Sequence, residues 1–208
     1  MISRTQIKAL AKRNIWVENQ VLRQILGICS MLAVTNLLSN SLVMGIGLIF
    51  TVSLSSWTIS LLRKWIPHRV RMIVQTLIIA SYVIFFDIII KANLPEISRS
   101  LGPYIGLIIT NCIIMGRAEA FAQHNPPLLS LLDGFFAGVG YTVVLVAVAF
   151  IRELLGFGTI FGFNVNFLEL ETWTLMVMPP AAFFIIGVFI WVLNNRAQKK
   201  VTGGGQNG

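Results

Sequence analysis

The chain has 208 residues, of which 56% are hydrophobic and 12% are charged, and its mean hydropathy is +0.80. Because a soluble domain carries about 25% charged residues, this composition excludes an ordinary soluble domain and indicates an integral membrane protein. The formal net charge of +8 would suggest nucleic-acid binding in a soluble basic protein, but no soluble basic face is evident, and we expect no nucleic-acid partner.

The two ends of the chain differ from its apolar centre. Residues 1–20 are basic and carry apolar residues at helical spacing, among them Ile7, Leu10 and Ile15. This pattern predicts an amphipathic helix on the membrane surface, with a basic tail lacking regular structure as the alternative. Residues 196–208 end in a glycine-rich sequence of linker composition and are expected to be flexible.

Six apolar stretches follow the basic segment and predict an all-α membrane protein. A straight spanning helix needs about 20 residues; the second, third and sixth stretches reach this length, and the fifth does so with its flanks. The first carries Arg23 and a polar break at Thr35 and Asn36, and the fourth is cut short by Gly116 and Arg117. In chain order the stretches are 21–38, 42–62, 72–90, 101–115, 135–151 and 173–193.

Lysine and arginine are distributed unevenly between the two sides that six crossings define. Thirteen of the 16 basic residues fall on the side of the N-terminus, and Lys91, Arg99 and Arg152 fall on the other side. Cytoplasmic loops of membrane proteins collect Lys and Arg. We therefore predict a multi-pass protein with both termini in the cytoplasm.

The stretches divide into two similar halves, 21–93 and 94–195. Each half has three stretches and carries its cysteine, Cys29 or Cys112, in the first and interrupted one. Because three crossings is an odd number, a duplicated unit must insert with the opposite orientation, and the pattern predicts two inverted repeats. In such proteins, interrupted segments at matching positions indicate the functional site.

The two cysteines have three interpretations at this stage. A lone buried cysteine usually behaves as a small apolar residue, and a disulfide requires that the two backbones lie close together. Thiolates are also soft metal ligands that favour iron–sulfur clusters, zinc or copper. An iron–sulfur cluster usually has four cysteine ligands, and this chain has two, so a cluster would require a partner that supplies the rest.

Two polar residues stand beside the second cysteine, inside an apolar stretch. Thr110 and Asn111 can bond the backbone groups that become free where a membrane helix is interrupted. An amide in a membrane helix can equally bond a neighbouring helix, and for Asn111 both interpretations stay open.

Five charged residues lie in or beside the apolar stretches. Asp87 and Lys91 lie one helical turn apart and predict an ion pair at the membrane interface. Arg117 and Glu119 follow the fourth stretch and either close the helix break or face a partner. Asp133, before the fifth stretch, is either the N-cap of a helix or a carboxylate on a sodium path, since hard cations take oxygen ligands.

The glycines indicate helix packing. Gly134, Gly138 and Gly140 form a face of small residues, which predicts close helix contact either between the two repeats or with a partner subunit. The sequence contains neither a phosphate-binding loop nor the glycine pattern of a dinucleotide-binding fold. We therefore expect no independent catalytic site.

Three long tracts carry a family resemblance. "GLIITNCIIMGRAEAFA", "RMIVQTLIIAS" and "FIRELLGFGTIFG" resemble the Nqr/Rnf family of membrane subunits, in particular the D-type subunits of the Na+-translocating NADH:quinone oxidoreductase. The similarity covers about residues 21–193. The E-type subunit of Rnf electron-transport complexes is the homologous alternative. Ser30 after Cys29, where the Rnf relative tends to have proline, favours the D-type subunits of the reductase.

The resemblance implies a fold, a cofactor and a partner. It implies six transmembrane helices in two inverted repeats, with the first helix of each repeat broken. The D-type and E-type subunits of this family pair with opposite topologies, and each gives two cysteines to one [2Fe–2S] cluster in the membrane. The matching ligands here are Cys29 and Cys112, with Thr110 and Asn111 beside them and Asp133 as a candidate for the sodium path.

The resemblance also implies a cellular setting and leaves other classes of function open. NADH, flavins and ubiquinone would bind to other subunits of a complex in the lipid of the bacterial inner membrane. An inverted repeat alone also suits a small secondary transporter, and a purely structural subunit would tolerate the loss of both thiols. We expect an electron-transfer subunit. Its iron content would distinguish it from a secondary transporter and from a purely structural subunit.

Overall fold

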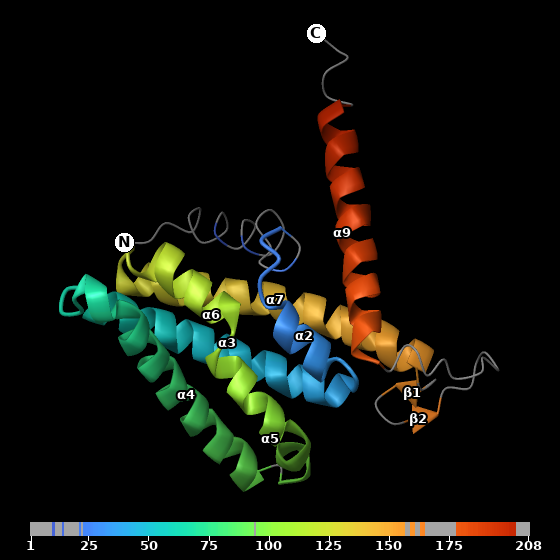
Figure 1. Ribbon diagram of the computed structural model, residues 1–208, viewed down its shortest axis with the longest axis horizontal. Coiled ribbons are helices and arrows are strands. Elements are labelled where there is room, and N and C mark those ends of the chain that lie inside the picture. The colour runs from blue at the N-terminus through green and yellow to red at the C-terminus, as the bar shows by residue number, and fades with distance from the viewer. Residues whose placement is uncertain are drawn as a thin grey trace.

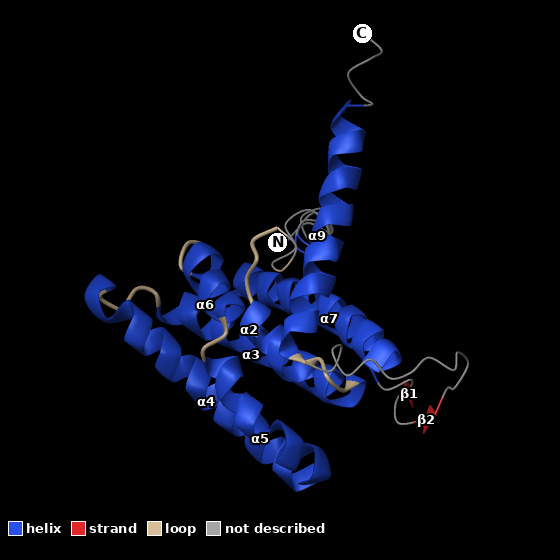
Figure 2. Cartoon of the chain, turned by 45° about the vertical axis from the view of Figure 1, so that its right-hand side comes forward, coloured by secondary structure: helices blue, strands red, loops and turns tan. Residues whose placement is uncertain are grey.

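A computed structural model describes residues 10, 14, 21, 23–93, 95–156, 159–160, 163–164 and 178–202. These residues are almost entirely helical (Figures 1 and 2), and the short strands β1 (Thr159–Ile160) and β2 (Phe163–Asn164) pair antiparallel. The described helices are α2 (Ile28–Val34), α3 (Leu38–Leu62), η2 (His68–Val70), α4 (Arg71–Asn93), α5 (Pro95–Ile109), α6 (Cys112–Arg117), the π-helix η3 (Ala118–Ala122), α7 (Pro127–Gly156) and α9 (Pro179–Thr202).

The described part of the chain contains four helical segments that are long and apolar enough to cross a membrane. They are Leu38–Leu62, Arg71–Asn93, Gly102–Ala122 and Pro127–Leu154. A shorter apolar segment, Pro180–Val192, lies within α9. The prediction of a helical, multi-pass membrane protein is therefore confirmed. Six crossings stay a prediction, and most of segment 1–20 and residues 203–208 lie outside the described residues.

Helices α3 and α7 form the centre of the molecule, side by side and antiparallel (Figure 1). A Cβ atom added at Gly134 of α7 would lie 2.9 Å from the backbone oxygen of Val52, and one at Gly138 would lie 2.9 Å from Cα of Ile49. Glycine allows two helix backbones to approach this closely because it has no side chain. The predicted contact face is confirmed for Gly134 and Gly138, and it lies inside this chain.

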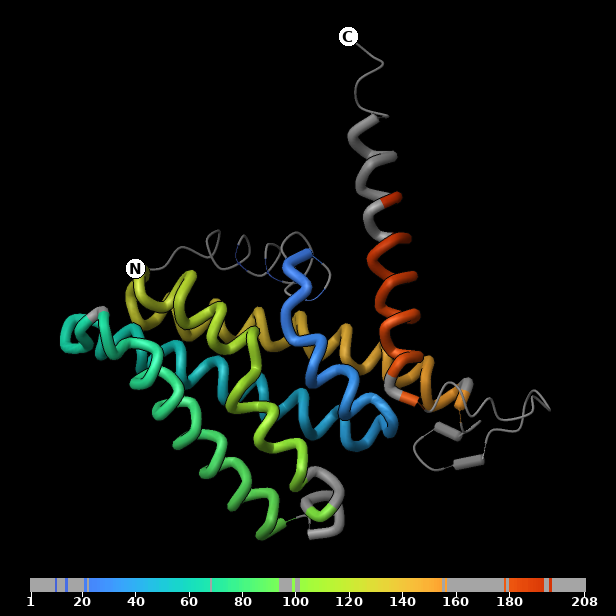
Figure 3. The backbone as a smooth tube through the Cα atoms, viewed as in Figure 1, coloured from blue at the N-terminus to red at the C-terminus, as the bar shows by residue number. Residues whose placement is uncertain are grey.

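Both interrupted stretches contain a break. The predicted break at Thr35 and Asn36 is confirmed, because these residues form the turn between α2 and α3. The backbone also changes direction at Gly27, directly before α2, where φ is 82°. In the second half, the chain leaves helical geometry between α5 and α6, as the tube in Figure 3 shows.

The two arginines that follow the matching apolar stretches make reciprocal contacts. Arg63, at the end of α3, donates from Nη1 to the carbonyl oxygen of Asn125, in the turn before α7, at 3.0 Å. Arg152, near the end of α7, donates from Nη1 to Oγ1 of Thr35, in the turn before α3. Each central helix thus fixes the turn at the start of the other.

Candidate functional site

Cys29 and Cys112 lie far apart in the sequence but line the same pocket, whose volume is about 160 Å³. Both are free thiols, and both are exposed in the isolated chain. Neither is a buried apolar residue here, and no disulfide joins them. The other lining residues are Gly27, Ser30, Leu107, Thr110 and Asn111.

Local sequence explains why a short helix begins directly before Cys29 and another at Cys112. Gly27 adopts a left-handed backbone that residues with a Cβ avoid, and α2 begins directly after it, with Cys29 in its first turn. Asn111 is the N-cap of α6, and its Oδ1 accepts a hydrogen bond from the backbone N–H of Ile113 at 3.1 Å. Asparagine is favoured at this position because its oxygen satisfies a free N–H group.

A buried hydrogen-bond network joins the two breaks. The Asn111 amide donates from Nδ2 to Oγ of Ser30 at 3.0 Å, and this oxygen lies 2.6 Å from the hydroxyl oxygen of Tyr141 on α7. Ser30 also donates to the carbonyl oxygen of Gly27 at 3.0 Å. Asn111 therefore does both things predicted for it: it caps α6 and it bonds a neighbouring helix.

Gly27 is the point where three elements converge. A Cβ atom at this position would lie 2.6 Å from Cδ1 of Ile113 on α6 and 3.0 Å from Cε2 of Tyr141 on α7. The glycine is therefore required both by its positive φ and by the closeness of its neighbours. This packing brings the segments that carry Cys29 and Cys112 together.

The pocket contains residues that the sequence indicates and residues that it does not. Thr110 lines the pocket, and its hydroxyl donates to the carbonyl oxygen of Gly106 at 3.4 Å within the same helical segment. The predictions did not include the network members Ser30 and Tyr141. Tyr141 follows Gly134 and Gly138 at helical spacing, and this pattern places its ring on the face that packs into the protein.

Asp133, outside the pocket, does not have the capping role that its place in the sequence suggests. Asp133 is not an N-cap, because α7 begins at Pro127 and places it in the helix interior. Its Oδ2 accepts from Nε of Arg117 at 2.8 Å, and its Oδ1 accepts from Nδ2 of Asn14 at 2.7 Å. All three side chains are buried. Asp133 does not line the cysteine pocket.

Two further ion pairs lie near the ends of α4. Glu119 pairs with Arg71, and not with Arg117. Arg71 also donates from Nη1 to Oε1 of Gln123 at 2.8 Å, which links α4 to the segment after α6. The predicted pair of Asp87 and Lys91 is confirmed, with 2.5 Å between Oδ2 and Nζ.

The pocket has too few ligating side chains to hold a metal centre by itself. Among the described residues, no group of three or more His, Cys, Asp or Glu side chains is placed to hold a metal ion. The whole sequence has only two cysteines. Two accessible thiols on one pocket fit half of a four-cysteine cluster, and the other half would have to come from another chain.

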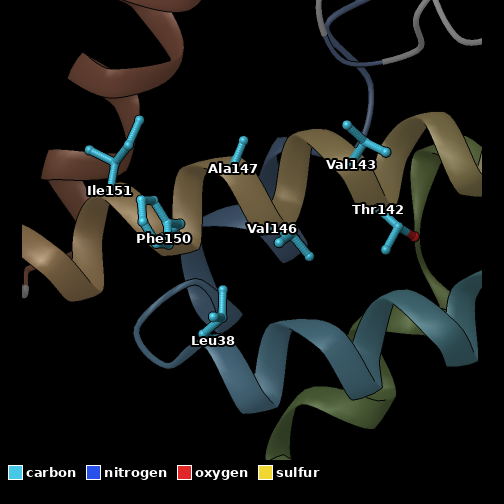
Figure 4. Close-up of a pocket in the computed structure, with 7 residues that line it drawn as sticks. All are labelled: Leu38, Thr142, Val143, Val146, Ala147, Phe150 and Ile151. Atoms are coloured by element: carbon cyan, nitrogen blue, oxygen red, sulfur yellow. The ribbon is translucent and has the colours of Figure 1, made fainter. Parts of the chain in front are cut away.

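A larger pocket, of about 530 Å³, lies between α7 and the start of α3 (Figure 4). Its lining is uncharged and mostly apolar, and Figure 4 shows Leu38 at the start of α3 on the side of α7 that carries Val146 and Phe150. It offers neither a metal ligand nor an acid or base. The lining residues are Leu38, Thr142, Val143, Val146, Ala147, Phe150 and Ile151.

The spans and the pocket define a multi-pass helical membrane protein in which two cysteines, one from each half of the chain, line one pocket. The chain belongs to the Rnf-Nqr family, since the family model described as "Rnf-Nqr subunit, membrane protein" matches residues 7–190. Relatives with similar sequences point to the same family. The D-type subunit of the Na(+)-translocating NADH-quinone reductase from Pseudoalteromonas translucida (strain TAC 125) is 47% identical over 206 residues, covering 97% of this chain and 98% of the relative.

Two relatives of the same name come from other bacterial groups. The protein from Chlamydia pneumoniae is 44% identical over 210 residues and covers 96% of this chain and 99% of its own length. The protein from Yersinia enterocolitica is 48% identical over 202 residues, with coverages of 93% and 95%. The similarity therefore extends over nearly the whole length of both proteins in each comparison.

Proposed function

We propose that this chain is a membrane electron-transfer subunit of a Na+-translocating NADH:quinone reductase, in the position that the D-type subunit holds in the relatives. It supplies Cys29 and Cys112 to a [2Fe–2S] cluster shared with a homologous E-type subunit. The observation that carries the proposal is that the chain's two cysteines, one from each half, line one pocket. Membership of the Rnf-Nqr family and the relatives' names support it.

The chemistry of the pocket residues fits such a centre. The two thiols are accessible, and thiolates are the ligands that iron–sulfur clusters require. When bound, the cluster would provide a one-electron carrier inside the membrane. The chain's own residues hold the two thiols at one place, through Gly27 and Asn111, and present them toward a partner. NADH, flavins and ubiquinone bind to other subunits in this proposal.

The proposed architecture has six crossings in two inverted repeats, 21–93 and 94–195. It is supported by the equivalent places of Cys29 and Cys112 after a break in each half. The contacts of Arg63 and Arg152 support it as well. An inverted repeat places equivalent residues at opposite ends of the molecule, and each of these arginines bonds the turn before the other central helix. Residues 196–202 continue helix α9, so they are not the flexible tail that the sequence predicts, and most of segment 1–20 and residues 203–208 lie outside the described residues.

The proposed location is the bacterial inner membrane, with both termini in the cytoplasm. Arg63 and Arg71 lie at the same end of the α3–α7 pair, since both bond to the segment 119–125. In the six-crossing arrangement, the larger share of Lys and Arg in the sequence falls at this end. The homologous E-type partner would have the opposite topology, and the remaining surface would contact lipid or other subunits.

The role of Asp133 is a separate part of the proposal. A carboxylate on a sodium path must offer an oxygen to the ion. Both oxygens of Asp133 already accept hydrogen bonds, one from Arg117 and one from Asn14. The sodium role therefore requires that one of these contacts opens, whereas a role in holding α6 against α7 requires no change.

An iron and acid-labile sulfide assay on the purified complex tests the proposed function. The account predicts iron, sulfide and the visible absorption of a [2Fe–2S] centre in preparations that contain this chain and its partner. A secondary transporter or a purely structural subunit would contain neither iron nor sulfide. An Rnf-type complex would also contain iron, but its electron donor would not be NADH coupled to quinone, and an NADH:quinone assay separates the two.

A further inference from the structure

We infer that Tyr141 and Ser30, together with Asn111, are positioning residues that fix Cys29 and Cys112 relative to each other. The inference rests on the proposed function in one respect, namely that the two thiols bind one centre. Neither Tyr141 nor Ser30 carries a sulfur atom. They act through the segments that bear the two cysteines.

The hydroxyl of Ser30 is the centre of the network and has three hydrogen-bond partners. A serine oxygen donates one hydrogen bond and accepts two. Oγ of Ser30 accepts from Nδ2 of Asn111, lies 2.6 Å from the hydroxyl oxygen of Tyr141, with either hydroxyl able to donate to the other, and lies 3.0 Å from the carbonyl oxygen of Gly27, to which the Tyr141 hydroxyl can also donate. Because Ser30 follows Cys29 and Asn111 precedes Cys112, this single atom joins the two cysteine segments.

Because the network is buried, the loss of any of its hydrogen bonds would destabilise the arrangement. Tyr141 is 0% exposed, Ser30 is 2% exposed and Asn111 is 4% exposed. A buried polar group that loses its partner costs about 1–3 kcal/mol, since no water replaces the lost bond. The three residues therefore favour one arrangement, in which every bond is formed, over looser ones.

Tyr141 supplies the fixed point of this arrangement. It lies on α7, which the close contacts of Gly134 and Gly138 hold against α3. In contrast, α2 has 7 residues and α6 has 6, and helices of this length have little stability of their own. Their places depend on contacts with the rest of the protein. The Tyr141 hydroxyl thus connects α2 to the central pair directly, and α6 through Ser30 and Asn111.

The test uses Tyr141→Phe in the complete complex, because this change removes one oxygen and keeps the ring. The matched control is Tyr82→Phe, since the Tyr82 hydroxyl also bonds a hydroxyl, that of Thr58 at 2.7 Å, between α3 and α4. Ser30→Ala is the second variant and breaks the network at its centre. The measurements are iron content, the electron paramagnetic resonance spectrum and the midpoint potential of the cluster.

We expect Tyr141→Phe and Ser30→Ala to change the spectrum and to move the midpoint potential, while Tyr82→Phe leaves both as in the wild type. A tenfold change in the equilibrium constant for reduction corresponds to about 59 mV in a one-electron step, and a shift of this order is the expected result. If both network variants keep the wild-type spectrum and potential, the inference is wrong.

A second measurement separates this inference from the proposed function. After iron is removed by a chelator, a short bis-maleimide should link Cys29 to Cys112, and peptide mass spectrometry measures the yield. Tyr141→Phe should lower this yield at least twofold relative to Tyr82→Phe. A wild-type complex without iron would contradict the proposed function, while the crosslink would still decide the positioning role. Equal yields in the two variants would overturn that role.

Discussion

Arg117, at the end of α6, donates from Nε to Oδ2 of Asp133 on α7, and the two atoms lie 2.8 Å apart. The two side chains are 4% and 2% exposed, so the pair is formed away from solvent. Asn14 completes the group by donating to Oδ1 of the same carboxylate at 2.7 Å. This contact ties the short helix that begins with Cys112 to the central pair of helices.

Breaking this pair from one side should destabilise the protein strongly. Asp133→Asn leaves the guanidinium of Arg117 buried without its counter-charge, and loss of one partner of a buried pair costs about 3–5 kcal/mol. Arg117→Gln should have a similar effect. The double variant should lose less than the sum of the two, because each change removes the same interaction. Unfolding temperature and the recovery of assembled complex measure the three variants.

Strictly additive effects would contradict the structural role of the pair. A different result would favour sodium binding: Asp133→Asn would then assemble with the wild-type unfolding temperature but would require a much higher sodium concentration for half-maximal turnover. Measuring assembly and the sodium dependence on the same preparation distinguishes these outcomes.

The close contact between α3 and α7 predicts a specific sensitivity at Gly138. Gly138→Ala places a Cβ atom 2.9 Å from Cα of Ile49, a backbone atom that cannot rotate away. Overpacking of this kind typically costs about 1–3 kcal/mol. We expect a lower unfolding temperature and, since Tyr141 lies on the same helix, a lower iron content.

Gly187→Ala on α9 is the matched control, because an added Cβ there meets no atom within 4 Å. Alanine is also a better helix former than glycine, by about 1 kcal/mol. This variant should therefore be neutral or slightly stabilising. If Gly138→Ala and Gly187→Ala behave alike, the two central helices are not packed as the structure describes.

The distribution of basic residues predicts the orientation of the chain in the membrane. A green fluorescent protein fused after Asn195 should fluoresce, because we expect the C-terminus in the cytoplasm. Alkaline phosphatase fused near Pro95, between α4 and α5, should be active on the other side. A fluorescent fusion near Pro95 would reverse the assignment of the two faces.

The long helices can be predicted from the sequence because they depend on composition along the chain. The apolar stretches 42–62 and 72–90 correspond to α3, which begins at Leu38, and to α4, which extends to Asn93. A run of apolar residues of this length has few alternatives in a membrane, since all its backbone groups must be bonded internally. The ends of the helices are harder to predict because polar flanking residues also adopt helical geometry.

The start of α7 differs from the prediction although the sequence contains a signal for it. The apolar stretch begins at Phe135, which places Asp133 just before it and suggests a cap. Pro127 is the actual first residue of the helix, and proline is favoured there because its fixed φ suits the first turn. A helix that starts at this proline has Asp133 in its interior.

The contacts of the candidate site cannot be predicted in the same way. The cysteines and Asn111 are recognisable by their residue types and their place in interrupted stretches. The bond between Ser30 and Tyr141 joins residues that are 111 positions apart, and only the folded arrangement brings them together. The break at Gly27 is also hidden, because its apolar neighbours continue the stretch and the polar pair Thr35 and Asn36 offers a more obvious interruption.

The most direct test of the central claim is to replace each cysteine by serine and measure iron in the purified complex together with quinone reduction. Cys29→Ser and Cys112→Ser should each lose the cluster, and the double variant should be no worse, because one missing ligand already removes the centre. NADH should still reduce the first flavin, while electrons fail to reach quinone. Leu107→Ala, in the lining of the same pocket, should be milder. Full iron content and normal quinone reduction in either cysteine variant would contradict the claim.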